Sequence, residues 1–113
     1  MSEENEIEVT VEGLKHQVSL REKLHRLLGN PDFKDLVLES YIQNEAVRIT
    51  KMLGDPAMRA NQRAFDSSID ELKAIGMFDN HLRSIEQLGN YAEDQLQAYE
   101  EMQRKQDFEE DGE

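Results

Sequence analysis

The sequence contains no cysteine and only two prolines among its 113 residues. Without cysteine, the chain cannot form a disulfide, a zinc–cysteine site or a catalytic thiolate. None of its apolar runs approaches the ~18 residues that a membrane-spanning helix requires, and no signal-peptide core follows Met1. We therefore expect a soluble, intracellular protein that has no membrane partner.

Apolar residues are also scarce, at 37%, while charged residues reach 34%. Globular domains average about 45–50% apolar and about 25% charged residues. A chain of this length forms one modest core, which excludes a two-lobed enzyme with a cleft between separate cores. The composition favours an elongated helical protein over a compact α/β fold.

The net charge of −12 is concentrated at the two ends of the chain. Residues 1–13 and residues 107–113 each carry five acids and no base, whereas residues 14–106 carry 15 acids and 13 bases. Uniformly charged segments with few apolar residues are typically disordered. We therefore expect a helical domain over residues 14–106 between an acidic flexible N-terminal segment and an acidic C-terminal tail.

The N-terminal segment has one β-like feature, because Ile7, Val9 and Val11 alternate with polar residues. A period of two with β-branched residues is typical of a short strand. A single strand is not stable alone, and no second strand pattern occurs in the sequence. The segment is therefore either disordered in the isolated chain or added as a strand to the sheet edge of a partner.

Helical spacing of apolar residues predicts a first helix over residues 14–28 that ends at Gly29, and a second over residues 31–53. Pro31 is compatible with a first helical turn, where its missing N–H has no intrahelical partner to lose.

A third helix should begin at Pro56, with Asp55 as its N-cap, and extend to about Gln106, a range in which no further proline occurs. The connections between successive helices are short, which favours antiparallel neighbours.

The long helix carries an apolar seam whose intervals alternate between four and three residues, as in a heptad repeat. Its members are Phe78, Leu82, Ile85, Gly89, Ala92, Leu96 and Tyr99. An upstream stripe, Phe65, Ile69, Leu72 and Gly76, is out of phase with this seam. We expect a kink, a stutter or a short break near residues 76–79.

These patterns predict an all-α fold with two shorter helices and a long C-terminal helix, arranged as an antiparallel hairpin or small bundle with disordered acidic ends. The seam is the candidate interface, either with another protein or, as a coiled coil, with copies of this chain. Gly89 lies on the seam, where it either permits a close helix approach or marks a weak point; we predict the close approach.

No arrangement of residues indicates catalysis, a cofactor or a metal site. The three histidines are scattered, and the six glycines do not form a phosphate-binding loop. Glu22 and His25 have the spacing used by helical di-iron proteins, but they occur once, whereas such sites use the pair twice. We predict a non-enzymatic protein without a cofactor.

Phe108 stands alone between Asp107 and Glu109 in the acidic tail. An aromatic residue in an acidic tail can anchor a short docking segment while the acids steer the encounter. Phe108 is therefore a candidate tail anchor, the alternative being a single aromatic residue just beyond the end of a helix.

Several spaced residue groups resemble those of small helical proteins encoded by tailed bacteriophages, over roughly residues 18–105. They are Pro31-Asp32-Phe33-Lys34, Tyr41, Glu45-Ala46-Val47-Arg48, Asp55-Pro56, Ala74-Ile75-Gly76 and Ala92-Glu93. Genes of this group lie among virion-assembly genes. The resemblance implies a phage protein in the host cytoplasm or the virion, and it assigns no role to any residue.

We therefore predict a virion structural or assembly protein whose partners are proteins: phage structural proteins or copies of itself. The alternative is a small acidic inhibitor, of the DNA-mimic or anti-defence type, that occupies a nucleic-acid-binding protein of the host. Direct binding to nucleic acid is not expected, because phosphates would repel a chain of this charge.

Overall fold

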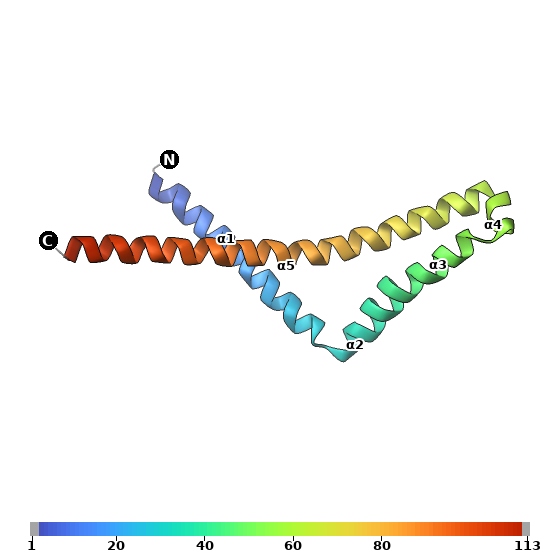
Figure 1. Ribbon diagram of the computed structural model, residues 1–113, viewed down its shortest axis with the longest axis horizontal. Coiled ribbons are helices and arrows are strands. Elements are labelled where there is room, and N and C mark those ends of the chain that lie inside the picture. Colours follow the sequence, from blue (N-terminus) through green and yellow to red (C-terminus); the bar gives the residue numbers. More distant parts are fainter. Residues whose placement is uncertain (1–2, 112–113) are drawn as a thin grey trace. The chain divides into compact units, whose positions relative to one another are not determined.

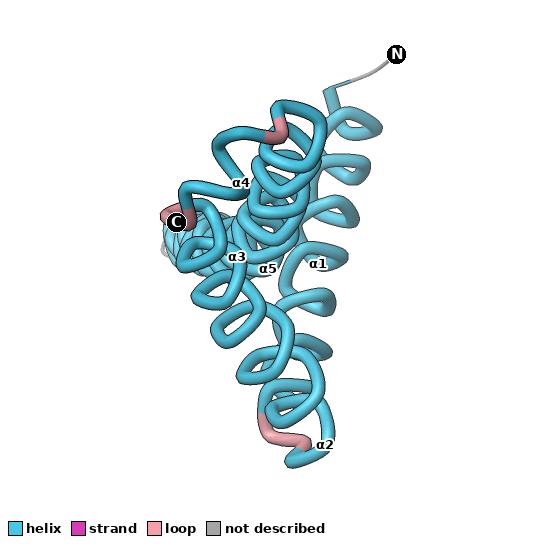
Figure 2. Tube along the Cα trace, turned by 90° about the vertical axis from the view of Figure 1, so that its right-hand side faces the viewer, coloured by secondary structure: helices cyan, strands magenta, loops and turns pink. Residues whose placement is uncertain are grey.

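The computed structural model describes residues 3–111, which form helices joined by short connections and contain no strand (Figure 2). In chain order, the elements are α1 (Glu3–Leu28), α2 (Pro31–Phe33), η1 (Lys34–Glu45), α3 (Ala46–Leu53), α4 (Pro56–Ala60) and α5 (Gln62–Asp111). The predicted all-α class, with shorter helices preceding a long C-terminal one, is confirmed.

The chain divides into two compact units, to which α1 and α5 both contribute. Unit 1 consists of Met1–Leu24 and Ser84–Glu113, and unit 2 consists of residues 25–83. By sequence, unit 1 has 16 acids and 5 bases, whereas unit 2 has 9 acids and 8 bases. Nearly all of the net negative charge of the protein therefore belongs to unit 1.

In unit 1, both helices extend further into the acidic ends than the sequence predicted. Helix α1 begins at Glu3 rather than near residue 14, and α5 continues past residue 106 to Asp111. Ile7, Val9 and Val11, whose alternation is typical of a strand, lie in α1 instead, and pairing of this segment with a partner's sheet stays a prediction. Glutamates in a first helical turn interact favourably with the helix dipole, and this chain offers no second strand for pairing. The flexibility of the acidic ends stays a prediction.

In unit 2, the two proline-containing restarts form as the sequence predicted. The Asn30 side chain accepts hydrogen bonds from two backbone N–H groups of the next turn, at 2.9 and 3.2 Å, and Pro31 occupies the first helical position. The Asp55 side chain caps α4 by accepting from the backbone N–H of Ala57 at 2.9 Å. Each cap satisfies donors that a helix start leaves unpaired.

A break at Asn61 corrects the predicted start of the long helix, which begins at Gln62 rather than at Pro56. Asn61 has extended backbone angles, and its side chain accepts a hydrogen bond from the backbone N–H of Ala64 at 3.1 Å. Asparagine is among the best N-cap residues, so it ends the short helix α4 and starts α5.

Between Pro31 and Leu53 the chain stays helical, but η1 has the i→i+5 hydrogen bonds of a π-helix. The wider turn changes which residues face inward. Phe33, Val37, Ile42 and Ala46 are half-buried at intervals of four or five residues, while Leu36 is largely exposed. The broad apolar surface that the sequence shows here is therefore only partly used in packing.

The core of unit 2 lies between α3 and the first part of α5, which meet at the α4 turn (Figure 1). Ile49 and Ile75 are buried, and the rings of Tyr41 and Phe78 meet edge to face with centroids 6.2 Å apart. Residue 41 thus lies beside residue 78, whereas Leu53, next to the turn, shares a hollow with Phe65.

Helix α5 has no break at residues 76–79, so that part of the prediction is wrong. The inward positions before the seam are Ser68, Leu72 and Ile75, followed at the same three- and four-residue spacing by Asp79 and Leu82. Gly76 is exposed, with open space where a side chain would be. The inward positions therefore pass from this stripe into the seam within one continuous helix.

Candidate interaction surfaces

In unit 1, α1 crosses α5 (Figure 1), and Arg21 of α1 lies directly over Gly89 of α5. A Cβ atom placed on Gly89 would lie 2.4 Å from the Cβ of Arg21 and less than 3.0 Å from its Cγ and Cδ. Cβ atoms do not approach other carbons so closely, so only glycine fits without displacing α1. The close approach predicted at Gly89 is therefore present within the chain itself.

The side chain that covers Gly89 is a buried arginine. The Arg21 side chain is 8% exposed, and its Nη1 donates hydrogen bonds to Asn90 Oδ1 at 2.8 Å and to Glu93 Oε2 at 2.6 Å. Its Nη2 donates to Glu22 Oε1 at 3.1 Å. The aliphatic stem thus packs on glycine while the guanidinium joins α1 to α5 through the Glu93 carboxylate and the Asn90 amide, and also pairs with Glu22 of its own helix.

The two carboxylates favour the charged form of Arg21. Hydrogen bonds from its guanidinium to Glu93 and then Glu22 raise the pKa of Arg21 above its ordinary value, against the opposing effect of burial. Arg21 Nε is buried without a hydrogen-bond partner. Sequence analysis did not identify this residue, because an arginine in an amphipathic helix is ordinarily exposed.

The predicted seam is thus partly covered within the chain. Gly89 and Ala92 are buried, and Phe78 contacts Tyr41. The remaining members, Leu82, Ile85, Leu96 and Tyr99, are half-buried. The face is a packing surface in the structure, and its role as an interface with another protein stays a prediction.

A second apolar stripe lies on α5 in unit 1, one residue out of step with the seam. Its exposed members are Leu88, Tyr91, Ala98 and Met102, at heptad spacing, and Tyr91 is 59% exposed. Because each residue advances about 100° around a helix, this exposed stripe lies about a third of a turn from the seam. The half-buried Gln95 interrupts the stripe, and sequence analysis missed it because the stronger seam runs beside it.

The candidate tail anchor Phe108 is 80% exposed on α5. Every residue from 100 to 109 is exposed, so Phe108 contacts no core in the structure. Its accessibility agrees with what docking would require, and docking itself stays a prediction.

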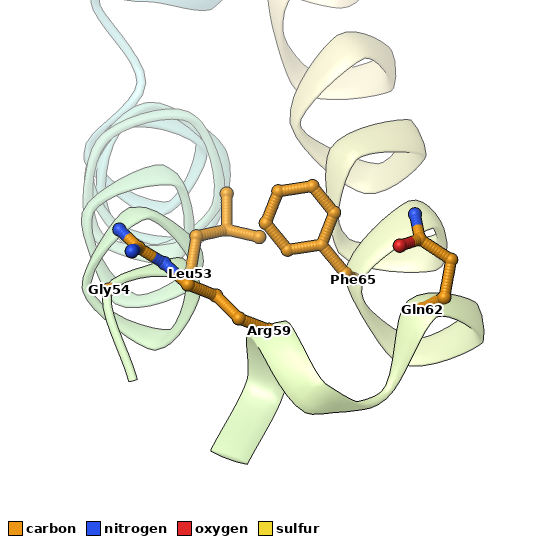
Figure 3. A pocket seen from close by; sticks show the side chains of 5 residues that line it. All are labelled: Leu53, Gly54, Arg59, Gln62 and Phe65. Carbon is orange, nitrogen blue, oxygen red and sulfur yellow. The ribbon is translucent and has the colours of Figure 1, made fainter. Parts of the chain in front are cut away.

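One hollow of unit 2 lies at the α4 turn (Figure 3). It has a volume of about 490 Å³ and is lined by Leu53, Gly54, Arg59, Gln62 and Phe65. The Leu53 and Phe65 side chains point toward one another, and Arg59 extends beneath them toward Gly54 (Figure 3). The hollow therefore combines an apolar floor with one cation.

A smaller hollow, about 220 Å³, lies between α3 and α5 and includes Tyr41, Ile49, Ile75 and an ion pair between Glu45 and Arg48. Arg48 Nε donates to both Glu45 oxygens at 3.1 Å, and Nη1 donates to Met52 Sδ at 2.8 Å. The hydrogen bonds from Arg48 lower the pKa of Glu45, and those to Glu45 raise the pKa of Arg48.

This ion pair gives a pH dependence with a definite sign. The pKa of Glu45 is lower in the folded protein than in the unfolded chain. The ionised Glu45 side chain therefore stabilises the fold at any pH above the ordinary glutamate pKa, and this contribution is lost as the pH falls through the pKa of Glu45 in the folded protein. We expect Glu45→Gln to lower the melting temperature slightly at neutral pH and not at about pH 3.

Thermal unfolding of both proteins across this pH range measures the effect. The matched control is Glu100→Gln, which removes a longer, exposed contact with Arg104 at 3.8 Å. If the melting temperatures of Glu45→Gln and the natural protein differ by the same amount at about pH 3 as at neutral pH, the account is contradicted.

Among the side chains that the structure describes, those of residues 10–109, no three histidine, aspartate or glutamate side chains are grouped so that they could hold a metal ion. None of the helices described in residues 3–111 combines the length and apolar character needed to cross a membrane.

Comparison of the chain with protein-family models, with curated proteins and with solved structures gave no match.

Proposed function

We propose that this chain is a non-enzymatic structural or assembly protein of a tailed bacteriophage, present in the host cytoplasm during infection or in the virion. It acts through protein–protein contacts of its helical surface. The phage assignment follows from the sequence resemblance, and the contact mode follows from the exposed stripe on α5.

The exposed stripe carries this proposal. Leu88, Tyr91, Ala98 and Met102 repeat at the spacing with which one helix packs along another. Soluble monomeric proteins seldom leave a contiguous apolar strip in water unless it binds something. The neighbouring seam is partly covered by the chain itself, so this stripe is the surface that remains for a partner helix.

Charge indicates what the partner should look like. Asp94 and Glu101 are exposed and flank one edge of the stripe, at the heptad positions that face a partner's charged residues. A partner helix with an apolar heptad and lysine or arginine along its edge would satisfy both features.

The proposal predicts that Tyr91→Glu in the phage lowers incorporation of the protein into particles or assembly intermediates at least tenfold, because binding would bury an unpaired charge. Stability should change by only about 0.5 kcal/mol or less, since Tyr91 is exposed. Mass spectrometry of purified particles and intermediates measures incorporation.

The matched control is Gln97→Glu, which adds the same charge to an exposed position of α5 away from the stripe. Equal incorporation of both variants, or absence of the natural protein from particles and from every assembly intermediate, would contradict the proposal.

The charge of unit 1 favours a second candidate, an acidic inhibitor that occupies a nucleic-acid-binding protein of the host. Unit 1 has 16 acids against 5 bases, and many of the acids lie on helices α1 and α5. Such an inhibitor would present ordered negative charge in place of phosphates.

Competition with DNA separates the two candidates. An inhibitor should displace DNA from a basic host protein, and the displacement should weaken steeply with rising salt. We expect no such competition from the full chain, because the acids of α5 are accompanied by an apolar stripe rather than forming a continuous polyanionic face. Salt-sensitive competition, measured by fluorescence anisotropy of labelled DNA, would favour the inhibitor instead.

A further inference from the structure

We propose that the hollow of unit 2 at the α4 turn binds Phe108 from a second copy of this chain. The inference deepens the proposed function by naming one partner and its contact, and it uses surfaces other than the exposed stripe. Three observations carry it: the shape and lining of the hollow, its unpaired cation, and the chemistry around Phe108.

The hollow can accept an aromatic ring. Leu53 and Phe65 are half-buried, and their side chains face each other across it (Figure 3). Its volume of about 490 Å³ is several times the ~150 Å³ of an apolar cavity that binds benzene. A second ring would cover apolar surface of both side chains that otherwise contacts water.

The hollow also has a cation without a partner. Arg59 lines it, is exposed, and makes no ion pair with any residue in the described part of the chain. Residues 51–63, which surround the turn, carry three bases and one acid. An occupant that combines an aromatic ring with nearby carboxylates would therefore match both the apolar side chains of the hollow and its cation, Arg59.

Phe108 has that combination. It is the most exposed of the large apolar residues in residues 10–109, and Asp107 and Glu109 adjoin it. Residues 106–111 carry four acids and no base; Arg104 and Lys105 lie one helical turn before Phe108 on the same side of α5, where Arg104 contacts Glu100. The ring can enter the hollow while the acidic segment meets Arg59.

The contact joins two different surfaces, so each copy offers one tail and one hollow. A contact of this kind is heterologous and repeats from copy to copy, producing open chains or a ring rather than a closed two-fold dimer. Head-to-tail repetition suits a protein that assembles into larger structures.

Sedimentation velocity over a range of protein concentrations tests the inference. The natural chain should self-associate, and either Phe108→Ala or Arg59→Glu should weaken association at least tenfold. Each variant retains one intact half of the contact. A mixture of the two should therefore form a 1:1 complex, in which the Arg59→Glu chain supplies the tail and the Phe108→Ala chain supplies the hollow. This complex should not add further copies, because neither chain retains both halves of the contact.

Two control variants match the changes without touching the contact. Lys73→Glu makes a charge reversal of the same sign at an exposed residue outside both the hollow and residues 51–63, and Met77→Ala shortens another exposed apolar side chain of α5. Both should associate like the natural chain, and circular dichroism should show the same helix content for all variants.

Three results would overturn the inference: a natural chain that stays monomeric, a Phe108→Ala variant that associates unchanged, or a mixture that forms no complex. Association that survives Phe108→Ala and is abolished by Tyr91→Glu would place self-contact on the exposed stripe, which rejects this inference and leaves the proposed function standing. Normal head-to-tail association with no incorporation into particles or assembly intermediates would support this inference and reject the proposed function.

Discussion

Gly89→Ala should destabilise the protein by about 1–3 kcal/mol, a drop of roughly 4–8 °C in melting temperature for each kcal/mol. The added methyl group would lie 2.4 Å from the Cβ of Arg21. A Cβ atom cannot rotate away as the end of a flexible side chain can, so α1 must move away from α5. The packing free energy lost at the crossing outweighs the gain in helix propensity that alanine ordinarily brings.

Gly76→Ala is the matched control on the same helix. Gly76 is exposed and has nothing within 4 Å of the position where a Cβ would stand, so alanine there should stabilise by about 0.5–1 kcal/mol. Gly89→Leu should be more damaging than Gly89→Ala because more atoms must be accommodated at the crossing. If alanine stabilises equally at both positions in thermal and urea unfolding, the crossing at Gly89 is not tight.

Reversing the charge of Arg21 should also lower the stability of the protein strongly. Arg21→Glu places a third carboxylate beside Glu22 and Glu93 in a side-chain position that is 8% exposed. Like charges that are partly desolvated repel strongly, and we expect the melting temperature to fall by about 10 °C or more. The matched control is Arg104→Glu, at an exposed arginine whose contact with Glu100 is 3.8 Å long, and it should have little effect.

Two further variants separate charge from packing at this position. Arg21→Met keeps an unbranched apolar stem over Gly89 and leaves Glu93 with solvent, so it should cost much less than Arg21→Glu. Combining Arg21→Glu with Glu93→Arg should recover part of the lost stability, because the pair is restored in reverse. A double variant no more stable than Arg21→Glu alone, in a full double-mutant cycle, would show that the two side chains do not interact.

The part of the fold that the sequence predicts well depends on local patterns. The prolines at 31 and 56 and their capping neighbours mark helix starts because the chemistry is confined to a few adjacent residues. The heptad spacing identified the inward face of α5, including Gly89, because a helix presents every third or fourth residue to the same side. Both kinds of signal can be read without knowing what lies across the interface.

What the sequence did not predict depends on partners in space. Arg21 looks like any exposed helical arginine until Gly89 is placed beneath it and Glu93 beside it. The π-helical stretch η1 depends on which carbonyl each N–H selects, and the side-chain pattern does not specify that choice. The exposed stripe was hidden because Gln95 interrupts it and because a stronger seam lies one residue away.

The central claim is that α1 packs on α5 at Gly89 and leaves the stripe around Tyr91 for a partner. The most direct test is a nuclear Overhauser measurement on the free protein, at a concentration where it is monomeric. We expect cross-peaks between the α-protons of Gly89 and the β- and γ-protons of Arg21, and none between Tyr91 ring protons and α1. Cross-peaks from Gly89 only to its own helix, or contacts between Tyr91 and α1, would contradict the claim.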